Sequence, residues 1–320
     1  MPSLPAHPTL VHVAAAAGVS VKTASRVFAG SDKVTAATAE RVRKAAELIG
    51  YHSNVLAREL RSGALSGLMG MVVSDLSNPF YADMAAGVAD ALDEAQVELM
   101  LTTSHDDPDK ERRLINSLLE RRVRGVVIVP TAADYSYLDM ERRRGFSFVF
   151  ADRPAPYLAA DTVLVDNRQG AAEALEHLLE RGCRRVALIA DDPTIWTSAE
   201  RMQGFRDAVL QRRLPAEQFP IVSGIHTSEA AATVTRGLPA VDGIVAANMP
   251  IALGVAATAT APLPIVCFDR FEGAAAMGIT TLDHDPARIG REVARILLGR
   301  CAAPDQSPFE TVVVPIHIEA

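Results

Sequence analysis

The sequence of 320 residues lacks the features that mark secreted, membrane-bound and metal-binding proteins. Its cysteines, Cys183, Cys267 and Cys301, are odd in number and far apart, which argues against a disulfide framework and against metal-type spacing. No apolar stretch reaches the roughly 18 uncharged residues of a membrane helix, and no cationic start followed by an apolar run marks a signal peptide. We therefore expect a cytoplasmic protein without a membrane partner or a metal site.

Common enzyme motifs are also missing. The chain has no G-x-G-x-x-G after the first predicted strand, no G-x-x-x-x-G-K-[ST], no G-x-S-x-G and no H-E-x-x-H. Aspartates and histidines near predicted strand ends could form a catalytic pair, but no spacing singles one out. We predict that the protein is not an enzyme and uses no cofactor. The alternatives are a sugar-modifying enzyme and a solute-binding protein without a DNA function.

Positive charge is concentrated at the start of the chain. Residues 1–63 carry 8 Lys and Arg against 4 Asp and Glu, a net charge of +4. The whole chain carries −7, so residues 64–320 carry −11. A basic head on an acidic body indicates a negatively charged partner that binds at one end.

Residues 10–54 have the pattern of a small helical domain. Four apolar residues recur at three- and four-residue spacing and form one stripe along a first helix: Leu10, Val13, Ala14 and Ala17. Gly18 can adopt the left-handed conformation that ends this helix. Ser20 can cap a second helix by accepting a hydrogen bond from the backbone N–H of Lys22 or Thr23.

The second helix is expected to bury Ala24 and Val27. Its outer face would carry four residues: Val21, Lys22, Ser25 and Arg26. A third helix, capped by Thr35, is expected to close the core with three residues: Val42, Ala45 and Leu48. A short turn between two helices, the second bearing cations, is the geometry that places side chains in a DNA major groove. The alternative is an alanine-rich hairpin with a solvated cationic face, but the charge partition favours DNA binding.

From residue 65 onward, short runs rich in Val and Ile alternate with amphipathic helical segments. The runs are LMGMVV, VELMLTT, GVVIVP, FSFVFA, RVALIA, PIVSG, GIVAAN and PIVCF. Such alternation predicts parallel sheets covered by helices on both faces. About 255 residues are more than a single α/β sheet domain usually contains, so we predict two doubly wound α/β subdomains after the helix-turn-helix.

Ligands of open α/β sheets bind beyond the carboxyl ends of the strands, and two facing sheets bring these ends to one cleft. Polar residues gather at the predicted strand ends. They are Asp75 through Tyr81, Ser104–Asp106, Pro130, Asp152–Arg153, Asp191–Thr197, His226, Asn248 and Asp269–Arg270.

Residues 10–54 resemble the DNA-binding headpiece of the lactose-repressor (LacI/GalR) family of bacterial transcription regulators, above all in the segment AGVS-x-x-T-x-SRV. The resemblance continues through VLARELRSG, NPFY and TTLDHDPARIGREVARILL, and therefore covers nearly the whole chain. The sequence departs from the family pattern at four headpiece positions: His12, Ala24, Ala39 and Ser53. None of these departures removes the helix-turn-helix.

The resemblance implies a division of the chain into a headpiece (1–50), a hinge (51–63) and a periplasmic-binding-protein-like core (64–320). Subdomain one would comprise about 64–163 plus 284–308, and subdomain two about 164–283 plus 309–320. Three crossings would join them, near Leu164–Asn167, Leu282–Pro286 and Phe309–Val312.

The resemblance also implies which residues contact DNA. Base readout falls to Val21, Lys22 and Arg26. In the hinge, Ala57 would lie on the minor-groove floor and Leu60 would wedge between base pairs, which bends the duplex. A plain linker is the alternative for this segment. The expected DNA-binding residues are Thr9, Ser20, Val21, Lys22, Thr23, Ser25, Arg26, Lys33, Thr35, Asn54, Ala57, Arg58, Leu60 and Arg61.

A small effector is expected in the cleft between the subdomains. The expected contacts are Phe80, Tyr81, Asp152, Arg153, Trp196, Thr197, Arg201, His226, Asn248, Asp269 and His284. Arginine forks and carboxylates suit vicinal hydroxyls or a carboxylate, so a sugar or sugar acid is favoured over a nucleobase. Arg270 near the rim would favour an anionic ligand. Structural alternatives stay open: Phe80 and Tyr81 can simply start a helix, and Asp152–Arg153 can be a structural ion pair.

Together, these expectations describe a repressor whose affinity for DNA is controlled by the effector. A two-fold homodimer would read a near-palindromic operator in double-stranded DNA. The last residues, VVVPIHIEA, contain no heptad tail, which favours a dimer over a tetramer.

Overall fold

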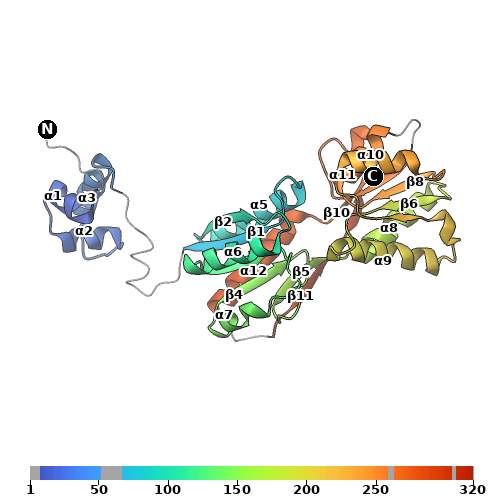
Figure 1. Ribbon diagram of the computed structural model, residues 1–320. Helices are drawn as coiled ribbons and strands as arrows, with labels where there is room; N and C mark the ends of the chain where they lie inside the picture. Colours follow the sequence, from blue (N-terminus) through green and yellow to red (C-terminus); the bar gives the residue numbers. More distant parts are fainter. Residues whose placement is uncertain (1–7, 52–66, 259–262, 305–307, 320) are drawn as a thin grey trace. The chain divides into compact units, whose positions relative to one another are not determined.

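The computed structural model describes residues 8–51, 67–258, 263–304 and 308–319. The chain divides into two compact units, Met1–Ser66 and Gly67–Ala320 (Figure 1). Among the described residues, no helix is both long enough and apolar enough to cross a membrane.

The first unit is a three-helix domain with α1 (Leu10–Ala17), α2 (Val21–Phe28) and α3 (Ala36–Leu48). Gly18 ends α1 in the left-handed conformation with a φ of 63°, as predicted. The predicted caps are also present: Ser20 Oγ accepts a hydrogen bond from the Thr23 N–H at 3.0 Å, and Thr35 Oγ1 accepts one from the Thr38 N–H at 3.4 Å. Eight residues form the buried core: Val13, Ala14, Ala17, Ala24, Val27, Val42, Ala45 and Ala46.

Leu48 does not belong to this core, contrary to the prediction. Its side chain is 80% exposed. The apolar face of α3 follows helical spacing from Val42 through Ala45 and Ala46 to the partly buried Ile49, and Leu48 lies off this stripe.

The second unit contains two six-stranded sheets, as the alternating pattern predicted. The first sheet has the order β11-β5-β4-β3-β1-β2, and all its neighbouring strands are parallel. Its strands are β1 (Leu68–Val73), β2 (Glu98–Thr103), β3 (Gly125–Ile128), β4 (Ser147–Ala151), β5 (Asp161–Val165) and β11 (Thr311–Val314).

The second sheet has the order β12-β10-β9-β8-β6-β7. Its strands are β6 (Val186–Ile189), β7 (Ile221–Val222), β8 (Gly243–Ala246), β9 (Ile265–Phe268), β10 (Ile279–Asp283) and β12 (His317–Glu319). Strand β12 pairs antiparallel with β10, so this sheet has one antiparallel edge. The remaining pairs are parallel.

Helices cover both faces of these sheets. They are α5 (Pro79–Glu94), α6 (Pro108–Glu120), α7 (Asp139–Arg143), α8 (Asn167–Glu180), α9 (Trp196–Gln211), α10 (Ser228–Gly237), α11 (Met249–Thr258) and α12 (Pro286–Ala302). In β1, Met69, Met71 and Val73 share a core with residues of α5 and α12, whereas Val72 packs with residues of α6. This alternation is that of a parallel strand buried on both sides.

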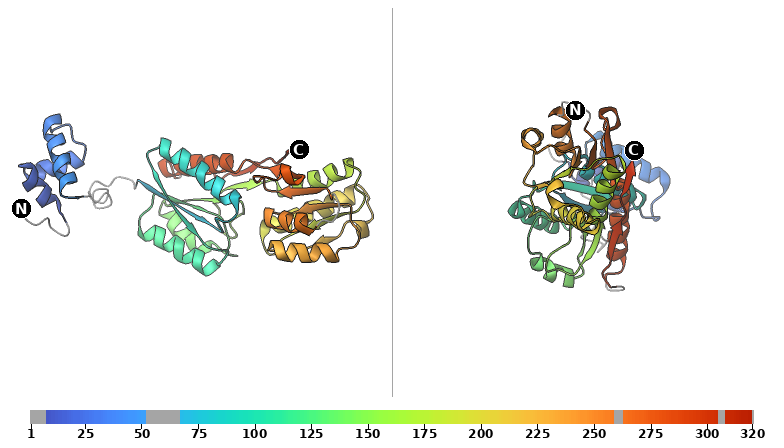
Figure 2. Two further views of the ribbon diagram at one scale, coloured as in Figure 1. Left: turned by 90° about the horizontal axis from the view of Figure 1, so that it is seen from above. Right: turned by 90° about the vertical axis from the view of Figure 1, so that its right-hand side faces the viewer.

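Helices α5 and α12 lie side by side in close contact (Figure 2). A Cβ atom added to Gly290 would lie 2.0 Å from the carbonyl oxygen of Met84, and one added to Gly87 would lie 2.0 Å from that of Ala287. Only glycine fits at these two positions, because any Cβ would overlap the neighbouring backbone.

The chain passes between the sheets three times. The first crossing follows β5 at Asp166, and the second follows β10 at His284–Asp285. The third lies at Pro315–Ile316, later than the expected Phe309–Val312, because β11 pairs with β5 in the first sheet. Residues 311–314 therefore lie in subdomain one, although they were expected in subdomain two.

A buried ion pair between α12 and β5 binds the residue that precedes this segment. Arg300 donates to both carboxylate oxygens of Asp161, at 2.8 and 2.7 Å, and the Glu310 N–H donates to Asp161 at 3.0 Å. These contacts were not evident from the short apolar run TVVV.

Candidate functional site

The first candidate site is the outer face of α2. Val21, Lys22 and Ser25 are exposed, and Arg26 is half-buried. In the described part of the chain, neither Lys22 nor Arg26 forms a salt bridge, and α2 contains no acidic residue. Both cations are therefore available to an anionic partner, as the sequence predicted.

The other expected headpiece residues lie around this helix. Thr9 caps α1 and contacts His12, whose Nδ1 accepts a hydrogen bond from the Thr9 N–H at 3.1 Å. Ser20 and Thr35 cap α2 and α3, and Lys33 is exposed. Five expected DNA-binding residues lie outside the described residues: Asn54, Ala57, Arg58, Leu60 and Arg61.

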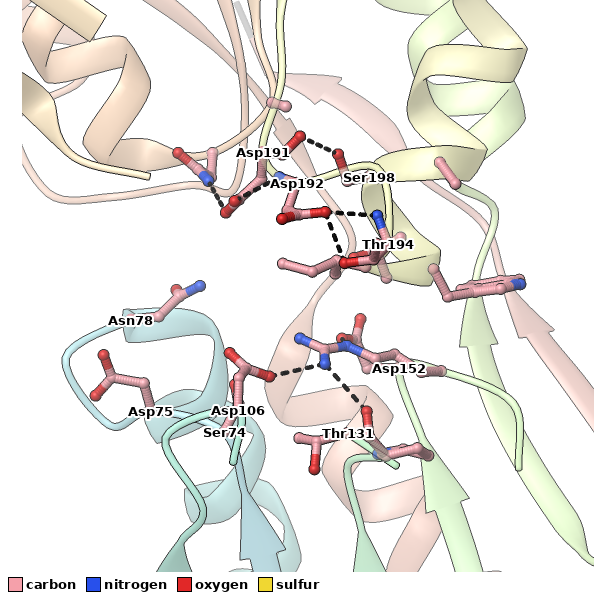
Figure 3. A pocket seen from close by; sticks show the side chains of 18 of the residues that line it. Ser74, Asp75, Asn78, Asp106, Thr131, Asp152, Asp191, Asp192, Thr194 and Ser198 are labelled. Atoms are coloured by element: carbon pink, nitrogen blue, oxygen red, sulfur yellow. Dashed lines mark hydrogen bonds and ion pairs between the residues drawn. The ribbon is translucent and has the colours of Figure 1, made fainter. Parts of the chain in front are cut away.

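The second candidate site is a cavity of about 980 Å³ between the two sheets of the core (Figure 3). Its walls come from the carboxyl ends of the strands, where an open α/β sheet presents its ligand site. After β1 come Ser74 and Asp75, after β4 Asp152, and after β6 Asp191, so both sheets contribute.

Ten of the eleven residues expected to contact the effector line this cavity. They are Phe80, Tyr81, Asp152, Arg153, Trp196, Thr197, Arg201, His226, Asn248 and Asp269. The exception is His284, which is 2% exposed and lies behind the wall. Its ring is 4.8 Å from that of Phe80, and its Nε2 lies 3.7 Å from Asp269 Oδ1.

Further polar residues line the cavity although no contact role was assigned to them. They are Asp75, Asn78, Asp106, Thr131, Asp191, Asp192, Thr194 and Ser198. Six of them were already among the predicted strand-end residues, and Thr131 and Ser198 directly follow two of those segments.

The wall from subdomain one begins at the start of α5. Asn78 Oδ1 caps this helix by accepting a hydrogen bond from the Phe80 N–H at 3.0 Å, and Pro79 occupies the first turn. Phe80 and Tyr81 are each 6% exposed, so they start the helix, pack in the core and line the cavity at once. The Tyr81 hydroxyl donates to Asp152 Oδ2 at 3.1 Å. Burial raises the pKa of Asp152.

Arg201 lies in the wall from subdomain two and contacts three residues there. Its Nε donates to Asn167 Oδ1 at 2.7 Å, its Nη1 donates to the Ala247 carbonyl, and its Cζ lies 4.3 Å from the centroid of the Phe268 ring. Burial raises the pKa of Asp269 to about 6, although the positive charge of Arg201 opposes this shift. Burial also lowers the pKa of His284 to about 3, and Arg201 acts in the same direction.

His226 and Asn248 meet at Asp191. His226 Nδ1 contacts Asp191 Oδ1, and Asn248 Nδ2 donates to Asp191 Oδ2 at 3.3 Å. Ser198 at the start of α9 donates to the Asp191 carbonyl at 2.9 Å. The half-buried Trp196 lies two residues before it, at the cavity wall.

The ionisable lining is predominantly acidic. Six aspartates line the cavity, against Arg153, Arg201 and His226. Arg270 does not line it, and its Nε lies 3.4 Å from Asp283 Oδ2. The expectation that Arg270 adds positive charge toward an anionic ligand is therefore wrong. Among the described residues, no group of three or more His, Cys, Asp or Glu could hold a metal ion.

A helix-turn-helix domain, followed by two facing parallel sheets with a polar cavity between them, defines a DNA-binding regulator with a small-molecule receptor. Residues 9–54 match the family described as "Bacterial regulatory proteins, lacI family". Residues 66–283 match "Periplasmic binding proteins and sugar binding domain of LacI family". The chain belongs to the LacI family of bacterial regulatory proteins. It is a DNA-binding transcriptional regulator and not an enzyme.

Individual relatives are similar over most of the chain. The maltose regulon regulatory protein MalI of Escherichia coli (strain K12) is 35% identical over 251 residues, which are 77% of this chain and 73% of that one. The HTH-type transcriptional regulator CelR of Thermobifida fusca is 31% identical over 326 aligned residues, 96% and 95% of the two chains.

Solved structures show the same architecture. A transcriptional regulator CelR–cellobiose complex has a TM-score of 0.70 at 28% identity, and the match covers 98% of this chain and 99% of that one. The Lac repressor dimer bound to operator and the anti-inducer ONPF has a TM-score of 0.84 over 98% of both chains. At 21% identity, this second likeness speaks for the fold alone.

Proposed function

We propose that this regulator is a cytoplasmic, homodimeric repressor, and that an uncharged, hydroxyl-rich ligand of the sugar class sets its affinity for operator DNA. The observation that carries this proposal is the lining of the cavity, where six aspartates outnumber the cations. Carboxylates accept hydrogen bonds from hydroxyl groups but repel anions, so the lining favours a sugar over a sugar acid.

Four of the expected contacts have a chemical role in this proposal. Asp152 from subdomain one and Asp269 from subdomain two accept hydroxyl hydrogens. Arg201, which has two of its N–H groups fixed by the protein, donates from its remaining nitrogen. Trp196 offers an aromatic face on which a sugar ring can stack. Cellobiose in the CelR complex is a neutral sugar held by a similar fold, which agrees with this class of ligand.

The DNA side follows from the headpiece. Lys22, Arg26 and Val21 read base edges in the major groove, and Arg26 can donate two hydrogen bonds to guanine. Leu60 wedges between base pairs at the centre of the site. A ligand that contacts both subdomains changes their relative rotation through the three crossings, and the hinge that follows each headpiece then gains or loses its DNA-bound conformation.

Two measurements on the full chain test this proposal. Thermal unfolding is followed with glucose, galactose, ribose, maltose and cellobiose, each against its sugar acid where one exists. We expect at least one uncharged sugar to raise the melting temperature and no sugar acid to do so. DNA binding is measured against salt: the affinity should fall by close to one log unit per log salt for each phosphate contact. A salt-independent affinity would contradict DNA binding through the headpiece.

A further inference from the structure

Arg153 is a cation of the cavity wall that is already paired with a carboxylate of the protein. Its guanidinium is 10% exposed and lines the cavity from the segment that follows β4. Nη1 donates to Asp106 Oδ1 at 2.8 Å and to the Pro130 carbonyl at 3.0 Å, and Nη2 donates to the Tyr81 hydroxyl at 3.3 Å. The Arg153 Nε is buried and forms no hydrogen bond with the described residues, although Asp152 Oδ2 lies 3.6 Å away.

Asp106 reaches this guanidinium from another strand end. It lies in the loop between β2 and α6, and its side chain is 45% exposed at the cavity. A dashed line from the labelled Asp106 carboxylate in Figure 3 marks this ion pair, which joins Asp106 Oδ1 to Arg153 Nη1 at 2.8 Å. His105 and Asp106 both have left-handed backbones, with φ of 55° and 52°, and Asp107 caps α6 directly after them. The turn therefore sets the backbone position from which the Asp106 side chain reaches Arg153.

We propose that Asp106 is a specificity-determining residue. Its carboxylate pairs with the Arg153 guanidinium and neutralises the positive charge, so that the cavity selects uncharged sugars over sugar acids and sugar phosphates. This inference rests on the proposed sugar effector. An arginine that faces a cavity and lacks a carboxylate partner binds carboxylates and phosphates in a bidentate manner. Here the partner is supplied by the protein, so an incoming anion would have to displace Asp106 or meet its negative charge.

Removal of Asp106 should leave the arginine in place. The Pro130 carbonyl and the Tyr81 hydroxyl still accept two of its hydrogen bonds, and neither depends on Asp106. Asp106→Asn removes the charge but keeps a side-chain oxygen for Nη1. Asp106→Ala removes both. In both variants the guanidinium loses the Asp106 charge and keeps Asp152, at 3.6 Å, as its carboxylate neighbour; in Asp106→Ala an Nη1 N–H also loses its acceptor.

The control is another aspartate of the same cavity. Asp192 accepts hydrogen bonds only within its own loop, from the N–H and hydroxyl of Thr194 at 2.7 and 2.6 Å, and it contacts no arginine among the described residues. Asp192→Asn removes the same unit of charge. It therefore separates the effect of the Asp106–Arg153 contact from that of the overall charge of the cavity.

The experiment compares the full chain and these variants by isothermal titration with inorganic phosphate, glucuronate, glucose 6-phosphate and glucose. We expect phosphate and the anionic sugars to bind Asp106→Asn and Asp106→Ala at least about tenfold more tightly than the wild type. Asp192→Asn should stay within about twofold of the wild type for the same anions. Any phosphate bound by the headpiece is common to all the proteins and cancels in this comparison.

Two results would overturn the inference: an unchanged anion affinity in both Asp106 variants, or an equal gain in Asp192→Asn. Circular dichroism checks that each variant is folded. If one Asp106 variant does not fold, the other still tests the inference. The phosphate titration decides the inference even if no sugar binds. Failure of every uncharged sugar with the wild type would instead contradict the proposed function.

Discussion

Replacement of Arg201 should destabilise the core, because its positive charge acts on two buried aspartates, Asp152 and Asp269. Asp152 and Asp269 are 4% and 6% exposed, and the positive charge of Arg201 lowers the pKa of both against the effect of burial. Arg201→Gln removes this charge, the bond to Asn167 and the bond to the Ala247 carbonyl. A buried acceptor that loses its donor typically costs a protein about 1–3 kcal/mol of unfolding free energy, and the lost charge adds to this cost where the aspartates are ionised.

The loss of unfolding free energy in Arg201→Gln should depend on pH. The pKa of Asp269 is about 6 in the folded protein against an ordinary value of 3.8, so the ionised form is disfavoured by folding. The variant should raise the pKa of Asp269 further, because the opposing charge is gone. The electrostatic part of the stability loss is therefore larger at pH 8, where Asp269 is ionised, and shrinks toward pH 5, where Asp269 takes up a proton.

Urea unfolding followed by circular dichroism at pH 8 and pH 5 measures both quantities. Arg201→Lys is the matched control: it keeps the charge but loses the planar fork, so it should restore most of the pH behaviour and only part of the stability. A stability loss that is equal at both pH values would refute the electrostatic reasoning and leave only lost packing.

Three further predictions concern packing, pH and the hinge. Gly290→Ala should lower the unfolding free energy by about 1–3 kcal/mol, because its Cβ would overlap the Met84 carbonyl. Gly299→Ala is the control and should be neutral or stabilising, because the space around Gly299 is open. Thermal unfolding compares the two variants. His284 has a pKa of about 3 in the folded protein against an ordinary value of 6.5, so the wild type loses stability as the pH falls below 6.5. At pH 5 this loss is about 2 kcal/mol, and His284→Gln should not show it. Urea unfolding of both proteins at pH 7 and pH 5 measures the loss, and an equal loss of unfolding free energy in the two proteins would contradict the prediction. Leu60→Ala should weaken binding to a selected operator while the melting temperature of the core stays the same; an unchanged operator affinity would reject the wedge.

Much of the fold could be predicted from the sequence because its signals are local. The caps at Ser20 and Thr35 and the left-handed Gly18 each depend on residues within one turn. The eight apolar runs all contain strands of the structure. The strand-end rule located the cavity, because parallel strands bring their carboxyl ends to one edge.

The remainder depends on contacts between distant residues. Strand β11 joins the first sheet by pairing with β5, beside an Arg300–Asp161 ion pair that links positions 139 residues apart, and the apolar run TVVV does not encode this choice. The partner of Arg153 was also not predictable, because Asp106 lies 47 residues earlier and several aspartates compete for the role. Leu48 was misplaced for a simpler reason: an apolar residue at a helix end can fall one position off the buried stripe.

The most direct test of the account is the affinity of the full chain for its operator with and without the sugar that stabilises it. The operator is selected from random duplex DNA by the protein itself, and the sugar is taken from the thermal-unfolding series. We expect the dissociation constant to change about 5- to 150-fold on addition of the sugar, and not to change in Arg201→Gln. An operator affinity that is the same with and without a saturating sugar would contradict the claim that the cavity controls the DNA-binding headpiece.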